Sequence, residues 1–286
     1  MEYLYSRRQI LRAATLAALS PRLLTPSFAA AGHAAISPTD GFRFVLASDL
    51  HYRDRRCGSW LERVTARIRQ LHPAPAFCVL DGDLSEDGRA GQLGAVKKIF
   101  ERLPMPIRAV AGNHDCSDSG DFSAYRRIYG ASLNYGFAHG DWDFLALDST
   151  EGPKVYRARI SDATLSWLDG TLKRRDRNRP LIILTHLPLG RNWLRPLNAQ
   201  ALLNRLHGHD LRAVLSGHWH GMTESWEDAA ELTTGRCCSW WRNNHDGSQE
   251  KGFTLCEVSS GQLHSRFIPV TMPAKLRTHF GILKDE

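Results

Sequence analysis

Residues 42–51 read FRFVLASDLH, an apolar run with the length of one β-strand that stops at Asp49 and His51. Four more apolar runs along the chain end in the same way, each followed by side chains that can bind metals or move protons. They are residues 77–80 before Asp81-Gly82-Asp83, 107–111 before Gly112-Asn113-His114-Asp115, 181–184 before His186, and 212–215 before Gly217-His218-Trp219-His220.

Helical patterns separate several of these predicted strands. Apolar residues recur at helical spacing in 60–71, 92–103 and 163–173, and a further strand is predicted over 143–147. After Gly221 the helical signal fades, and residues 231–234, 253–258 and 263–268 alternate like a meander of strands. Units of βαβ followed by a β-rich portion indicate an α/β fold. No linker rich in Pro, Gly or Ser divides this part, so we expect one domain over residues 40–286.

The residues after the strands form a pattern that is typical of a metal site. In open α/β sheets, sites form at the carboxyl ends of the strands. The D-x-H and H-x-H spacings suit loops, where alternate residues can turn toward one point. Imidazole and carboxylate together favour Zn, Fe or Mn. Glycines before Asp83, Asn113 and His218 permit backbone conformations that aim these side chains.

The ordered set Asp-x-His, Gly-Asp, Gly-Asn-His-Asp, an isolated His and Gly-His-x-His resembles the calcineurin-like metallophosphoesterase superfamily. The resemblance implies a four-layer αββα sandwich, in which two mixed β-sheets are flanked by helices, with two divalent metal ions at the carboxyl ends of the strands. It also implies the ligands. The first metal would be held by Asp49, His51 and His220, the second by Asn113, His186 and His218, and Asp83 would bridge the two.

Elementary chemistry is consistent with these roles. Two close cations can clamp the attacking and leaving oxygens of an in-line displacement, and a water that bridges them becomes the nucleophile near neutral pH. A shared carboxylate such as Asp83 offsets the repulsion between the cations. His114 is not a ligand in the family; if protonated, it can act as a general acid toward the departing oxygen. Asp115 either orients His114 or caps its loop.

Subgroup signals are weaker. Purple acid phosphatases of this superfamily carry a tyrosine three residues after the aspartate of Gly-Asp, and Glu86 stands at that position here. An iron–tyrosinate centre is therefore not expected. The compact motif set is most similar to the class III cyclic nucleotide phosphodiesterase and glycerophosphodiesterase group. The motifs assign neither a substrate nor a preference for monoesters over diesters, and they leave the metal as Mn, Fe or Zn.

Other features have competing interpretations. Arg53, Arg191 and Trp193 lie in loops after predicted ligands, and they either contact an anionic or aromatic substrate or are ordinary exposed residues. The basic run 173–179 and the pair His207 and His209 both follow predicted helices, so we interpret them as solvated helix ends. Asp81 and Asp148 either support the ligands or stabilise turns.

The first residues resemble a twin-arginine (Tat) export signal. Arg7 and Arg8 precede a moderately apolar stretch, and Ala29-Ala30-Ala31 offers a cleavage site. We therefore predict a signal peptide over residues 1–31, the Tat machinery as a partner, and a periplasmic or secreted bacterial protein. The apolar stretch is far shorter than the ~20 residues that a membrane span needs.

The charge of the chain argues against a nucleic-acid partner. The 286 residues include 37 Lys and Arg against 30 Asp and Glu, a formal charge of +7. Loss of residues 1–31 removes four Arg and one Glu, a net +3, and leaves +4. This excess is small for a nucleic-acid binder. We therefore expect a dinuclear-metal hydrolase of small phosphodiesters or phosphomonoesters. The alternatives are a nuclease of the same superfamily and a metal-binding module without catalysis.

Overall fold

The computed structural model describes residues 41–152 and 157–273. The predicted signal peptide at 1–31 lies outside the described residues, and the single-domain assignment over 40–286 remains a prediction. Strand β1 (Phe42–Ser48) is the strand predicted from the FRFVLAS run. It lies in the middle of its sheet, parallel to β2 and antiparallel to β10.

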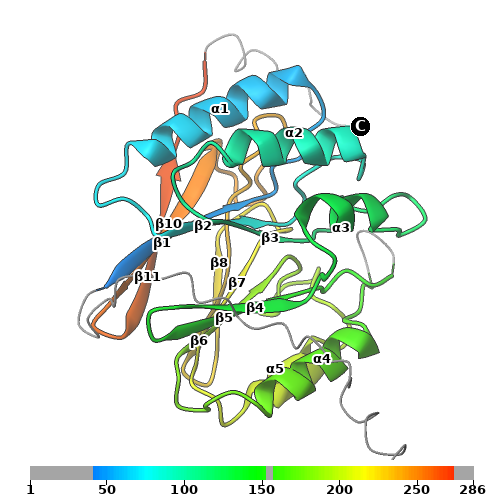
Figure 1. Ribbon diagram of the computed structural model, residues 1–286, viewed down its shortest axis with the longest axis vertical. Coiled ribbons are helices and arrows are strands. Elements are labelled where there is room, and N and C mark those ends of the chain that lie inside the picture. The colour runs from blue at the N-terminus through cyan, green and yellow to red at the C-terminus, as the bar shows by residue number, and fades with distance from the viewer. Residues whose placement is uncertain (1–40, 153–156, 274–286) are drawn as a thin grey trace, which may run out of the picture. The chain divides into compact units, whose positions relative to one another are not determined.

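The strands of the described residues form two mixed sheets (Figure 1). The first has the order β11-β10-β1-β2-β3, where β2 is Phe77–Asp81, β3 is Ile107–Val110, β10 is Gly252–Ser259 and β11 is Gln262–Pro269. The second has the order β4-β5-β6-β7-β9-β8, where β4 is Tyr135–His139, β5 is Trp142–Leu147, β6 is Leu181–Thr185, β7 is Leu211–Ser216, β8 is Thr223–Glu227 and β9 is Ala230–Thr234.

Helices cover the outer face of each sheet. Helices α1 (Arg55–Arg69), α2 (Ala90–Phe100) and α3 (Ser123–Tyr129) lie on the first sheet, and α4 (Asp162–Leu172) and α5 (Ala199–Leu206) lie on the second (Figure 1). Successive strand residues point to opposite faces, so Val45 packs under α1 while Phe44 packs between the sheets. The predicted four-layer αββα sandwich is confirmed.

The aromatic centre of the interface between the sheets gives one stability prediction. The Phe144 side chain is fully buried there, with its ring 4.8 Å from the ring of Phe137 and 5.6 Å from that of Phe44. Phe144→Ala should lower the free energy of unfolding by about 3–5 kcal/mol because a cavity replaces these contacts. Urea denaturation measures the change. The exposed control Leu197→Ala should stay within about 0.5 kcal/mol, and an equal loss in both variants would contradict the packing assigned to Phe144.

Some element predictions were wrong. Residues 231–234, 253–258 and 263–268 do not form one meander, because β9 pairs in parallel with β7 in the second sheet while β10 and β11 form a hairpin in the first. Helix α1 begins five residues before the predicted start, where the Asp54 side chain caps its first turn. Helix α5 ends before His207, and Gly208 has a positive φ, which agrees with the predicted helix end.

No helix in the described ranges 41–152 and 157–273 has both the length and the apolar character that a membrane crossing requires.

Candidate metal centre

The carboxyl ends of β1, β2, β3, β6 and β7 carry the seven predicted ligands, and all seven side chains are buried. They are Asp49, His51, Asp83, Asn113, His186, His218 and His220. Strands β1, β2 and β3 are parallel to one another, and so are β6 and β7, so their carboxyl ends lie at one edge of each sheet. The topology therefore brings residues that are up to 171 positions apart into two adjoining groups.

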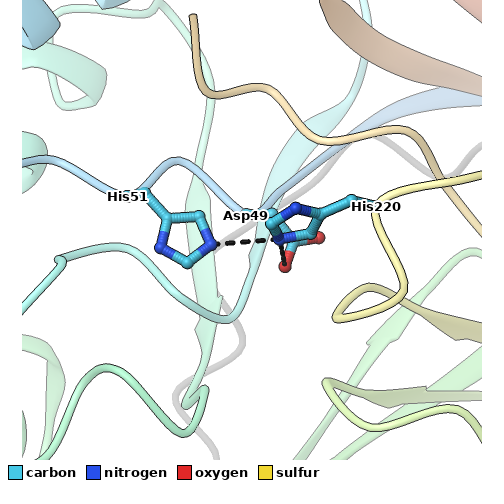
Figure 2. A group of neighbouring side chains, drawn as sticks. All are labelled: Asp49, His51 and His220. Carbon is cyan, nitrogen blue, oxygen red and sulfur yellow. Dashed lines mark hydrogen bonds and ion pairs between the residues drawn. The ribbon is translucent and has the colours of Figure 1, made fainter. Parts of the chain in front are cut away.

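The first group consists of Asp49, His51 and His220, whose ligand atoms all lie within 4.8 Å of one another (Figure 2). The Nε2 atoms of His51 and His220 are 3.1 Å apart, and His220 Nε2 lies 3.2 Å from Asp49 Oδ1. Ligand atoms that bind one ion at about 2.0–2.2 Å have separations of this size. The arrangement thus fits a single cation among the three side chains.

The second group consists of Asp83, His186 and His218, again within 4.8 Å of one another. Asp83 Oδ2 lies 3.2 Å from His186 Nε2 and 3.6 Å from His51 Nε2, so this carboxylate adjoins both groups. Its other oxygen accepts a 2.8 Å hydrogen bond from the His114 backbone N–H. This position between the two groups is the one that a bridging ligand must have.

Buried polar atoms without hydrogen bonds support the second group independently. In residues 41–152 and 157–273, these atoms include both side-chain amide atoms of Asn113 and the Nε2 atoms of His186 and His218. Burial of polar atoms without a partner costs free energy, and such atoms are rare in native proteins. All three side chains belong to the set predicted for the second metal. The amide oxygen of Asn113 and the imidazole nitrogens of His186 and His218 are therefore available to bind a divalent cation.

Burial and neighbouring charges shift the pKa values of the three side chains in the second group. Burial alone would raise the pKa of the Asp83 carboxyl, but His186 and His114 hold that pKa well below its usual range. Burial would lower the pKa of His186, but Asp83 and Asp49 raise it to about 10. Burial, together with His186, lowers the pKa of His218 to about 4. The buried carboxylates thus favour positive charge at His186, and a bound cation would supply that charge in place of a proton.

Hydrogen bonds from Nδ1 fix the ring orientation of three predicted ligands. The Nδ1–H of His51 donates to Glu86 Oε2 at 2.9 Å, that of His186 to the Asp81 carbonyl at 3.0 Å, and that of His220 to the Asn243 carbonyl at 3.2 Å. A carbonyl or carboxylate oxygen can only accept, so each ring carries its proton on Nδ1. Nε2 is then the nitrogen that can bind a metal. Sequence reasoning missed these roles of Glu86 and Asn243.

The backbone at the centre is unusual. Eight non-glycine residues in the described part of the chain have positive φ, and five of them are predicted ligands: Asp49, His51, Asp83, His218 and His220. Gly82 has a φ of +75°, and a Cβ there would lie 2.2 Å from His186 Nδ1. A Cβ on Gly112 would lie 2.0 Å from the Asp83 backbone nitrogen. These glycines are needed because the motif loops approach one another closely.

Glu86 gives a prediction about metal affinity. Its carboxylate binds the ring of His51 and also pairs with Arg242. Glu86→Gln removes the negative charge that holds the His51 ring with its proton on Nδ1 and leaves Nε2 available for a metal. The affinity of the first group for its metal should therefore fall by about 10–100-fold. Titration of the metal-free protein with Mn²⁺ measures this, and the exposed Glu62→Gln on α1 is the matched control. Unchanged affinity in Glu86→Gln would show that Glu86 does not support His51.

His114 lies beside the centre and its side chain is 22% exposed. Its Nδ1–H donates to the Glu86 carbonyl at 2.8 Å, and its ring packs edge-on against that of His51 with 4.9 Å between centroids. This arrangement leaves Nε2 as the nitrogen that can serve a substrate. Of the two roles left open for Asp115, its hydrogen bonds favour the loop cap over orientation of His114. Asp115 accepts hydrogen bonds from Ser85 and from the Gly112 backbone N–H, so it holds the loop together.

The predicted substrate contacts lie in two places. The Arg53 guanidinium stacks on the Trp241 ring at 4.3 Å, and Trp241 in turn donates from Nε1 to the His51 carbonyl at 3.0 Å. Arg191 is exposed, and the Trp193 side chain is 65% exposed. Asp148 accepts hydrogen bonds from Thr150, and the Asp81 carboxyl makes none in the described residues, so these hydrogen bonds link neither side chain to a predicted ligand.

Comparison with known proteins places this centre in a family. The family model for calcineurin-like phosphoesterases matches residues 42–222, a range that contains all seven predicted ligands. The chain belongs to this family. Calcineurin-like phosphoesterases use a dinuclear divalent-metal site, and the residues described above fit one.

Two curated relatives have phosphodiesterase names. A 3′,5′-cyclic-nucleotide phosphodiesterase of Nostoc sp. is 31% identical over 163 residues, which are 55% of this chain and 60% of that protein. The 3′,5′-cyclic adenosine monophosphate phosphodiesterase CpdA of Pseudomonas aeruginosa is 28% identical over 167 residues, which are 56% of this chain and 60% of that protein. The chain therefore spans less than two thirds of the length of these relatives.

Solved structures agree on the fold. The purple acid phosphatase PPD1 of yellow lupin has a TM-score of 0.58 and 15% identity, over 80% of this chain and 52% of its own. GAP50, the anchor in the inner membrane complex of Plasmodium, has a TM-score of 0.57 and 16% identity, over 86% of this chain and 95% of its own. At this identity the likeness concerns the fold alone.

Proposed function

We propose that the protein is a dinuclear-metal hydrolase of phosphoesters that acts on small phosphodiesters. The observation that carries the proposal is the position of Asp83 between two groups of buried ligands, with Oδ2 3.6 Å from His51 Nε2 and 3.2 Å from His186 Nε2. Two divalent ions held there would supply positive charge for the phosphoryl oxygens and would activate a water for in-line attack.

The residues of the chain have separate tasks in this reaction. Asp83 adjoins both groups of ligands, and Asn113 adds a neutral oxygen donor, which limits the charge of the site. His114 lies next to His51 with Nδ1 already bonded to the Glu86 carbonyl. A proton on its Nε2 can pass to the departing oxygen, which makes His114 the general acid.

Cyclic nucleotides are the first substrates to test, because relatives from Nostoc and Pseudomonas carry such names. The small net charge of +4 expected without residues 1–31 speaks against a nuclease with an extended basic groove. Salt-sensitive binding of DNA would revive that alternative.

Purified protein supplied with Mn²⁺ or Fe²⁺ should hydrolyse bis(p-nitrophenyl) phosphate, with release of p-nitrophenol as the measurement. Asn113→Ala should abolish hydrolysis of this compound and of p-nitrophenyl phosphate together. A protein that binds two metals and turns over neither compound would support the metal-binding module without catalysis.

Export by the Tat route is proposed on the sequence of residues 1–31, with a periplasmic or secreted location. Arg7→Lys combined with Arg8→Lys should retain the protein in the cytoplasm of a bacterial host, as measured by cell fractionation. Unchanged export would contradict the assignment. Folding before export would load the metals in the cytoplasm, which favours Mn or Fe, and two zinc ions in native protein would overturn this preference.

A further inference from the structure

A row of aromatic rings leads from the metal centre to the surface. His245 stacks on the ring of His220 with 5.8 Å between centroids and an angle of 25°. Trp219 stacks on His245 at 5.0 Å and 30°, and Trp193 meets Trp219 edge-on at 6.0 Å and 85°. His220 is a predicted ligand, so the row begins at the site of chemistry and ends at a side chain that is 65% exposed.

Backbone contacts hold the row in place. The Trp219 N–H donates to the Gly217 carbonyl at 2.7 Å, and the His245 N–H donates to the His220 carbonyl at 2.8 Å. At the outer end, Asn192 forms a turn around Trp193, because its side-chain oxygen accepts from the Leu194 N–H and its carbonyl from the Arg195 N–H. The rings are therefore carried by hydrogen-bonded loops.

The same loop is fixed to the second sheet. The Arg191 N–H donates to Ser225 Oγ on β8 at 3.4 Å. A Cβ on Gly190 would lie 2.2 Å from Ser225 Oγ and 3.3 Å from Leu232 Cβ on β9, so the chain lies directly on these strands. Trp193 thus stands at right angles to Trp219 on an anchored segment. A large aromatic ring that stays mostly exposed beside a buried polar site is suited to stacking with a ligand.

We infer that Trp193 and Trp219 form a corner that binds a flat aromatic group, such as a nucleobase, on the organic part of a phosphoester substrate. The inference rests on the proposed function, because the row of rings connects the corner with the predicted ligand His220 in three steps of 5.0–6.0 Å between ring centroids. Stacking of one base on an aromatic side chain strengthens binding by an amount that Trp193→Ala should remove. The corner would then select aromatic phosphoesters over aliphatic ones.

The test compares two substrates that differ only in the base: 3′,5′-cyclic AMP and the cyclic phosphate of methyl riboside. Trp193→Ala should raise KM for cyclic AMP by about 5- to 150-fold and leave kcat unchanged. The KM for the cyclic phosphate of methyl riboside, which has no base, should stay the same. Trp193→Phe should restore part of the affinity. The matched control is Trp226→Ala, because Trp226 is 60% exposed on β8 and lies outside the row. An equal effect of Trp193→Ala on both substrates, or on neither, would overturn the inference.

A binding measurement separates this inference from the proposed function. Adenosine contains the base but no phosphate, and its affinity for the protein can be measured by calorimetry whether or not the protein hydrolyses anything. Adenosine that binds the wild-type protein more tightly than Trp193→Ala supports the corner even if no phosphoester is cleaved. Equal affinities, or no binding to either protein, refute it even if bis(p-nitrophenyl) phosphate is hydrolysed.

Discussion

Asp83→Asn is expected to reduce bound metal from two ions per chain to one or none, and to lower kcat/KM for bis(p-nitrophenyl) phosphate by roughly 10³-fold or more. The substitution keeps the size of the side chain and removes its charge. Because Asp83 Oδ2 adjoins His51 in one group and His186 in the other, both groups lose the anion between them. Two cations would then repel each other without a shared carboxylate.

Elemental analysis and p-nitrophenol release on the same preparation test this prediction. Asp228→Asn is the matched control, since the Asp228 side chain is 82% exposed and lies far along the chain in the β8–β9 turn. The control should retain both metals and the full rate. Retention of two metals and normal turnover in Asp83→Asn would remove the bridging role from Asp83 and weaken the proposed function.

His114→Gln is expected to lower kcat by about 10²–10⁴-fold on a diester with an aliphatic leaving group while both metals stay bound. An aliphatic alkoxide is a poor leaving group and needs a proton as the bond breaks. p-Nitrophenolate leaves readily without one, so the loss on bis(p-nitrophenyl) phosphate should be much smaller. The partial exposure of His114 and its bond to the Glu86 carbonyl suit a proton donor that substrate can reach.

The comparison of the two leaving groups distinguishes acid catalysis from structural damage. A variant with a distorted metal centre would lose both activities to the same degree and would lose metal as well. The exposed His264→Gln on β11 is the control and should alter neither rate. An equal loss on both substrates with metals retained would indicate that His114 binds the phosphoryl group and does not deliver a proton.

The positions of the predicted ligands followed from the sequence for a physical reason. β2 and β6 are buried over their whole length, and β1, β3 and β7 become buried toward their carboxyl ends, so the apolar run of each strand ends visibly where polar residues begin. Parallel pairing then places these ends together. The supporting residues had no such signal. Glu86 lies in a loop with no periodicity, and Asn243 contributes a backbone carbonyl, which no side chain reveals.

Strand β8 and helix α3 were not predicted from the sequence, because neither has an apolar face that creates a periodic pattern. Strand β8 lies at the end of its sheet, with every residue partly or fully exposed, so TESWE lacks an apolar face. Helix α3 has one buried residue, Tyr125, which is too little to create a periodic pattern. The sheet that each late strand joins was also not predictable, because β9 and β10 both alternate in the same way while they pair in different sheets. Tertiary pairing decides their place.

The positive φ angles of five predicted ligands limit which substitutions can stabilise the protein without loss of activity. Each such residue costs about 1–3 kcal/mol relative to relaxed backbone, although Asp and His tolerate this region better than most side chains. Glycine at Asp49, His51, Asp83, His218 or His220 would relax the loop and delete a ligand in the same step. Thermal robustness and activity are therefore opposed at these positions, and protein engineering for heat resistance has to begin elsewhere, in the layers of the sandwich.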